Sequence, residues 1–225
     1  MRTKTLILTA VLSAAGLATS LAQNPVYSQN AVGYINVNLS AGYTLIACQL
    51  NASPNNSLET IFGTALAAGD TVFKFNGTSF DSAIYAGGSF LYSGPTFSLN
   101  PGEGAFVQTT AAKTVTFVGE VPQGGAGSGK PTLTVPLVVG YNVVSSVVPQ
   151  SAPLGSLGFP VQAGDTVFFY TGTGFDSWIA ADATGNAWLP SNPAGPAQPT
   201  PAVGQAFFAQ LGAAATWNRD FNVNQ

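Results

Sequence analysis

The sequence predicts an all-β protein made of two tandem repeats, each a small antiparallel β-sandwich or open barrel with one short helical turn. The first observation is a duplication: residues 69–82 return at residues 164–177 with ten of fourteen positions identical. The second is composition, since 46% of residues are hydrophobic and 11% aromatic, whereas only 7% are charged. The third is a series of short alternating segments bounded by Gly, Pro or Asn.

The N-terminus has the pattern of an export signal. Arg2 and Lys4 precede an uncharged, mostly apolar run over residues 5–18, and Ser20-Leu21-Ala22 offers small residues to a signal peptidase. We expect a signal peptide at residues 1–22. The alternative is a membrane anchor, although the run is shorter than the ~20 residues that a span needs.

The charge of the remaining chain excludes several partners. After cleavage, four basic residues face nine acidic ones, a net charge of −5. Neither nucleic acid nor an anionic membrane is therefore an expected partner, because both attract basic surfaces. The later apolar segments are interrupted by Gly, Pro or Asn, so we expect no membrane span after cleavage.

The first repeat, placed at residues 23–122, begins with an alternating segment that indicates a half-buried strand. Ser57, with Glu59 two residues later, is typical of a helix N-terminus. Asn76-Gly77 predicts a type I′ hairpin turn, in which both central residues have positive φ. The expected elements are strands at 31–38, 43–49, 71–75, 80–85 and 114–121, a strand within 102–108, and a helical turn at 57–62.

The second repeat, placed at residues 131–225, follows the same order. Gly140-Tyr141 aligns with Gly42-Tyr43 at an offset of 98. A stretch at 190–201 holds five prolines, which excludes a central strand and suggests an exposed loop of polyproline character. The expected elements are strands at 132–136, 141–148, 166–170, 175–180 and 216–223, a strand within 204–210, and a helical turn at 154–157.

The segment between the repeats, residues 123–130, reads Gln-Gly-Gly-Ala-Gly-Ser-Gly-Lys. Its glycines predict a flexible linker. A phosphate-binding loop is the alternative, but the Gly-Lys-Ser/Thr ending and the following helix are missing from the pattern.

The composition leaves little catalytic apparatus. The chain has no histidine, which excludes His-based triads and the usual zinc and copper sites. Paired carboxylates would suit a glycoside hydrolase, but an Asp beside a turn commonly accepts hydrogen bonds from nearby amides, so we expect structural roles. The acids considered are Asp70, Asp81, Glu103, Asp165 and Asp176. We expect no catalytic residue, no metal site and no cofactor.

Cys48 is the only cysteine, so an intrachain disulfide is impossible. The register of the repeats sets Cys48 against Ser146. Because the equivalent position holds a serine, we expect Cys48 to be a small buried residue without a chemical role. The alternative is that Cys48 is a reactive thiol or forms an intermolecular disulfide.

The candidate ligand-binding residues are aromatic. Tyr85, Tyr92, Trp178 and Trp188 lie in or beside the variable loops, where exposed rings could stack on sugars. The alternative is packing in the core or between the repeats, because most aromatic rings in β proteins are buried. Trp178 aligns with Ala83, so the shared fold does not require that ring, whereas we expect Trp217 in the core.

Several motifs span nearly all of the mature chain. They are Tyr-Ser-Gln-Asn-Ala-Val-Gly-Tyr at 27–34, Ala-Gly-Tyr-Thr-Leu-Ile-Ala at 41–47, Gly-Asp-Thr-Val-Phe in both repeats, Pro-Gly-Glu-Gly-Ala-Phe-Val-Gln at 101–108, Thr-Phe-Val-Gly-Glu-Val at 116–121 and Trp-Asn-Arg-Asp-Phe at 217–221. On these residues the chain resembles a family of exported bacterial proteins, common in verrucomicrobial genomes, with two β repeats after a signal peptide. The resemblance implies the fold and export, but no activity and no site residues. Where that family has Asn-Pro, this chain has Cys48-Gln49.

These observations favour a non-enzymatic exported structural or interaction protein of the cell envelope or extracellular matrix. Its expected location is periplasmic, cell-surface or extracellular. Its expected partner is a protein or glycan at the cell surface, with self-association as a further expectation. The first alternative is a carbohydrate-binding module that uses the aromatic candidates, and the second is a carboxylate-based glycoside hydrolase.

Overall fold

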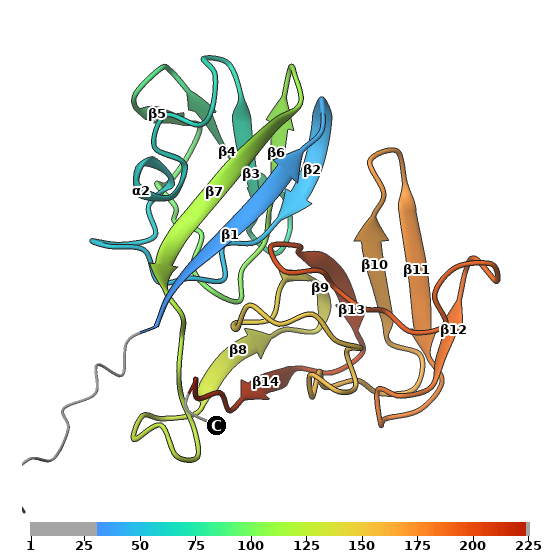
Figure 1. Cartoon of the computed structure of the whole chain (residues 1–225). Coiled ribbons are helices and arrows are strands. Elements are labelled where there is room, and N and C mark those ends of the chain that lie inside the picture. Colours follow the sequence, from blue (N-terminus) through green and yellow to red (C-terminus); the bar gives the residue numbers. More distant parts are fainter. Residues whose placement is uncertain (1–30, 224–225) are drawn as a thin grey trace, which may run out of the picture.

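Figure 1 shows the computed structural model, which describes residues 31–223 as two similar halves of β structure. The predicted fold class, an all-β protein with two sandwich-like repeats, is confirmed. The predicted signal peptide at residues 1–22 lies outside the described residues. Within residues 31–223, no helix is long and apolar enough to cross a membrane.

The first repeat packs a two-stranded ribbon against a five-stranded sheet. In the ribbon, β1 (Val32–Leu39) pairs antiparallel with β7 (Lys113–Glu120). The sheet has the strand order β2-β6-β3-β4-β5. Its strands are β2 (Gly42–Ile46), β3 (Thr71–Phe75), β4 (Phe80–Tyr85), β5 (Phe90–Tyr92) and β6 (Ala105–Thr109). Inward side chains such as Val72 and Phe117 fill the space between the two layers.

One short helix, α2 (Leu58–Phe62), closes an end of this sandwich by burying Leu58 and Phe62. Ser57 is its N-cap, as predicted, because its side chain accepts a hydrogen bond from the Thr60 amide. In the second repeat, the predicted helical element is only a turn, in which the Leu157 amide donates to the Pro153 carbonyl.

The second repeat has the same plan. Its ribbon pairs β8 (Leu133–Leu137) with β14 (Ala215–Arg219), and its sheet has the matching order β9-β13-β10-β11-β12. The strands of that sheet are β9 (Gly140–Val144), β10 (Thr166–Tyr170), β11 (Phe175–Ala180), β12 (Trp188–Pro190) and β13 (Phe207–Leu211). Trp217 on β14 is fully buried, which confirms its predicted place in the core.

The hairpin between β3 and β4 forms, but the predicted type I′ turn is wrong. The loop spans residues 76–79, and Gly77 has a φ of 101° whereas no non-glycine residue in the described part of the chain has positive φ. Asn76 instead accepts hydrogen bonds through Oδ1 from the amides of Thr78 and Ser79. An Asx-type turn of this kind needs a glycine at one position only.

Residues 123–130, predicted to be a flexible linker, make backbone hydrogen bonds near both ends of the segment. Gly124 exchanges two backbone hydrogen bonds with Phe221, and the Gly125 amide donates to the Lys130 carbonyl. A Cβ atom on Gly124 would overlap the Pro131 carbonyl oxygen. The glycines here allow close backbone packing rather than free rotation.

The proline-rich stretch at 190–201 is a mostly exposed loop, as predicted. It begins as β12 and continues as a turn in which the Gly195 amide donates to the Asn192 carbonyl. The carbonyl of Pro196 then accepts a hydrogen bond from the Trp178 ring nitrogen at 2.9 Å. Local hydrogen bonds therefore hold this loop against the second repeat.

The two repeats meet through equivalent pairs of contacts, as an approximate two-fold axis requires. The Ala47 amide donates to the Gly204 carbonyl at 2.9 Å, and the equivalent Ser145 amide donates to the Gly102 carbonyl at 3.0 Å. Figure 1 shows β2 of one repeat and β13 of the other converging at this junction. The junction therefore extends both sheets by backbone pairing instead of leaving two independent domains on a tether.

Candidate interaction surface

The central strands β3 and β10 carry apolar side chains on both faces of their sheets. Because successive side chains of a strand point to opposite sides, burial of Val72 in the core directs Phe73 and Phe75 to the outer face of β3. On β10, burial of Val167 directs Phe168 and Tyr170 outward in the same way.

The outer faces carry five aromatic positions that recur in both repeats, and we call these ten rings the aromatic face. Its pairs are Tyr43 and Tyr141, Phe73 and Phe168, Phe75 and Tyr170, Phe80 and Phe175, and Phe106 and Phe208. Sequence reasoning missed this set because it favoured rings that differ between the repeats. The sequence does contain a signal for this set, because aromatic residues recur at alternate positions of equivalent strands in the two repeats.

The inner rings of the aromatic face join the two repeats. Phe106 lies 5.2 Å from Tyr170 and 6.0 Å from Phe208, and Phe75 lies 6.3 Å from Phe208 (distances between ring centroids). Aromatic pairs at such separations add stability beyond the area that they bury. The inner rings of the aromatic face therefore pack at the contact between the two repeats.

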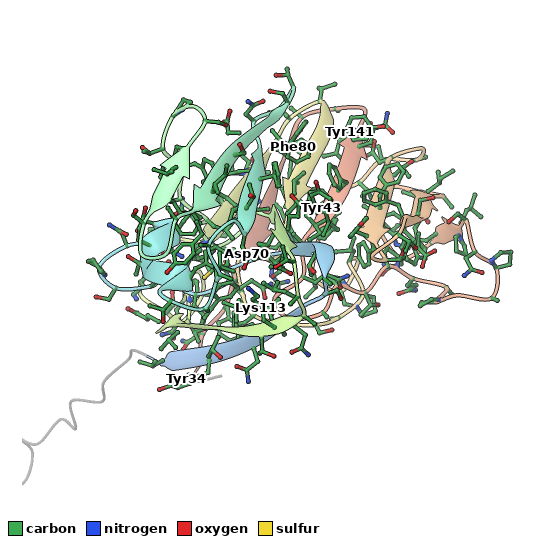
Figure 2. The ribbon with its side chains drawn as sticks, turned by 90° about the horizontal axis from the view of Figure 1, so that it is seen from above. Tyr34, Tyr43, Asp70, Phe80, Lys113 and Tyr141 are labelled. Carbon is green, nitrogen blue, oxygen red and sulfur yellow. The ribbon has the colours of Figure 1, made fainter. Side chains whose placement is uncertain are left out.

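The outer rings remain open to solvent. Tyr43, Phe80, Tyr141 and Phe175 have exposed fractions of 42 to 48%. Figure 2 shows the labelled Tyr43, Phe80 and Tyr141 in one region between the strands of the two repeats. A pocket of about 470 Å³ opens there, lined by Phe75, Gly77, Thr78, Tyr141, Phe168, Phe175 and Phe208.

The outer sheet faces are also free of charge. The outward positions of β3, β4 and β6 hold only Thr, Phe, Ser, Ile and Gln, and those of β10, β11 and β13 hold the same types with one Tyr. Ile84 and Ile179, both exposed, extend the apolar area beyond the rings. Covering these faces would desolvate no charged group, and such desolvation is the main cost of burying polar surface.

Three of the four predicted ligand residues are buried. Trp178, Trp188 and Tyr85 lie in the cores, and each donates a hydrogen bond from its ring polar group to a backbone carbonyl, at 2.7 to 3.1 Å. These three rings present no free face for sugar stacking. They pack in the core, which was the alternative expectation. Tyr92 is only partly buried.

Four of the five acids considered for catalysis, all except Asp176, accept structural hydrogen bonds. Asp70 and Asp165 each accept from the amide three residues upstream, at 2.8 and 2.7 Å. Glu103 and its counterpart Gln205 do the same at 2.7 and 2.9 Å, so the turn needs an acceptor and not a charge. Asp81 accepts a hydrogen bond from the Asn76 side chain. Across residues 31–223, no group of three or more His, Cys, Asp or Glu residues could hold a metal ion.

Cys48 is fully buried, and burial raises the pKa of its thiol. Because the thiolate is the reactive form, we expect the native protein to react with Ellman's reagent at pH 8 only when it unfolds. A Thr78→Cys variant supplies an exposed thiol as the control. Labelling of Cys48 in native buffer at the rate of that control would contradict the prediction.

The aromatic face offers ring surfaces, aliphatic area and tyrosine hydroxyls, without a charged side chain at its outward strand positions. Such a surface is suited to binding rather than to acid–base chemistry. Comparison of the chain with protein-family models, with curated proteins and with solved structures finds no match in any of the three.

Proposed function

We propose that this chain is a non-enzymatic, exported structural protein of the cell envelope or extracellular matrix that self-associates through the aromatic face. The observation that carries the proposal is the presence of exposed rings at equivalent positions in both repeats. A contiguous apolar patch rimmed by polar residues is typical of a protein interaction site, and Tyr and Phe are enriched at the centres of such sites.

A second copy of the chain is the partner that the charge distribution favours. The mature chain has a net charge of −5, so charged parts of its surface disfavour contact with another copy. The outer sheet faces are an exception, because their outward strand positions carry no charge. Two copies can therefore approach along these faces with the least repulsion.

Export is supported by the sequence pattern at residues 1–22 and by the resemblance to exported two-repeat proteins. A low-charge surface rich in Ser, Thr, Asn and Gln is consistent with that location. Cleavage after Ala22 can be tested by N-terminal sequencing of the exported protein.

Sedimentation velocity tests the self-association. We expect the chain without its predicted signal peptide (residues 23–225) to show a sedimentation coefficient that rises with concentration. The double variant Phe80→Glu/Phe175→Glu should weaken association at least tenfold, about 1.4 kcal/mol, because contact would bury two unpaired carboxylates.

A Tyr34→Glu variant is the matched control, since it exchanges an exposed ring for a carboxylate on β1. Figure 2 shows Tyr34 well away from Tyr43, Phe80 and Tyr141, and its exposed fraction is 73%. This variant should associate as the unmodified chain does. A monomer at every concentration, or equal association by the double variant, would reject the proposed assembly.

A further inference from the structure

The first repeat contains a second, polar groove that is separate from the aromatic face. It has a volume of about 650 Å³ and lies beside α2 and β5. Of its eleven lining residues, nine carry a polar side chain other than an aromatic ring. They include Glu59, Lys74 and Glu103, three charged side chains in a chain that has few.

Two of the charged groups of the groove, Lys74 and Glu103, are held in place. The Lys74 ammonium lies 2.8 Å from Glu103 Oε1 and donates to the Ser98 carbonyl at 2.8 Å. Lys74 and Glu103 remain partly exposed, so both stay accessible from the groove. A fixed donor next to a fixed acceptor is suited to a ligand that presents adjacent hydroxyl groups.

The groove also has an aromatic wall. The Tyr92 ring meets the Phe97 ring edge to face, with centroids 5.3 Å apart. Burial and the negative charge of the neighbouring Glu59 carboxylate raise the pKa of the Tyr92 hydroxyl. The hydroxyl therefore stays protonated at neutral pH, and the contact with Phe97 supports the ring from one side.

The shared fold does not require this combination of residues. Strand pairing places Lys74 opposite Asp81 and Phe169 opposite Asp176, so Lys74 and Phe169 are equivalent. By the same reasoning Tyr92 corresponds to Pro190, which pairs with Trp178 as Tyr92 pairs with Ala83. Gln205 replaces Glu103 and, with the two helical segments aligned, Gly155 replaces Glu59. The second repeat thus builds the same sandwich without a charge at any of these positions.

We propose that this groove binds a neutral carbohydrate. Hydroxyl groups of a sugar can pair with carboxylate, ammonium and amide groups, and a sugar face can pack on a tyrosine ring. Two carboxylates against one ammonium give the groove a net negative charge, which disfavours sulfated or uronic sugars. The inference goes beyond the proposed self-association and uses none of the residues of the aromatic face.

Titration calorimetry of residues 23–225 against cellohexaose, xylohexaose, laminarihexaose, mannohexaose and chitohexaose tests the proposal. We expect at least one of these probes to bind, and Tyr92→Ala to weaken that binding about tenfold or more, the cost of losing one stacked ring. Lys74→Met should also weaken it. Tyr92→Phe keeps the ring and should lose less than Tyr92→Ala.

Tyr141→Ala is the control, because it removes a partly exposed ring from the aromatic face. Its sugar affinity should equal that of the unmodified chain. Absence of binding to all five probes, or equal losses from Tyr92→Ala and Tyr141→Ala, would overturn the carbohydrate site. Release of reducing ends from a bound sugar would instead overturn the non-enzymatic part of the proposed function and leave the binding site intact.

Discussion

Replacing Gln49 with methionine is expected to lower the free energy of unfolding by about 4 kcal/mol, the cost of leaving several buried backbone groups unpaired. Gln49 is buried and reaches from the first repeat into the second. Its Nε2 donates to the carbonyls of Ser146 and Val148 at 3.0 and 3.3 Å, and its Oε1 accepts from the Gly204 amide at 2.8 Å. Methionine has a similar length but makes none of these three hydrogen bonds.

Urea unfolding followed by tryptophan fluorescence and circular dichroism measures this effect. All three tryptophans belong to the second repeat, so a difference between the two signals would report that the repeats have uncoupled. Gln108→Met makes the same chemical change at an exposed outward position on β6 and should alter stability by less than about 0.5 kcal/mol. A Gln49→Met midpoint close to that of Gln108→Met would contradict the role of Gln49 as a bridge.

Sequence predicted twelve of the fourteen strands in residues 31–223 because duplication and alternation are local signals, and it missed the three-residue strands β5 and β12. The expected strand at 31–38 and the observed β1 differ by one residue at each end. The expected strand at 43–49 fails at its end, since β2 stops at Ile46 and Ala47 bonds to the other repeat. Local pattern cannot identify a partner that lies more than 150 residues away in the chain, and it also cannot distinguish a flexible glycine from a closely packed one such as Gly124.

The candidate site was harder to predict because a strand that is apolar on both faces does not reveal which face the core covers. Val72 and Phe73 are adjacent and both apolar, so the pattern is equally typical of a strand buried on both sides. Trp178 shows the converse difficulty. Its position beside a variable loop suggested exposure, yet its ring packs 5.1 Å from Phe169 inside the second repeat, where the first repeat has Lys74 and Ala83.

Replacing Lys113 with methionine is expected to lower the free energy of unfolding by about 3 kcal/mol, as when one partner of a buried ion pair is lost. Figure 2 shows Lys113 and Asp70 close to one another within the first repeat. The Lys113 ammonium contacts Asp70 Oδ2, and the Asp70 side chain is fully buried. Asp70 Oδ1 already has no hydrogen-bond partner among residues 31–223. The equivalent Asp165 differs, because its Oδ1 accepts from the Gly212 amide at 2.7 Å.

Removing the Asp70 charge as well distinguishes the effect of an unpaired carboxylate from a simple loss of packing in Lys113→Met. Asp70→Asn in the Lys113→Met background should recover part of the lost stability, since a neutral amide needs no cation and can still accept from the Ala67 amide. Lys130→Met is the control, because its pair with Glu120 is exposed and such pairs contribute at most about 1 kcal/mol. Urea midpoints that fall equally for Lys113→Met and Lys130→Met would contradict the prediction, because the first repeat would then tolerate an unpaired Asp70 carboxylate in its interior.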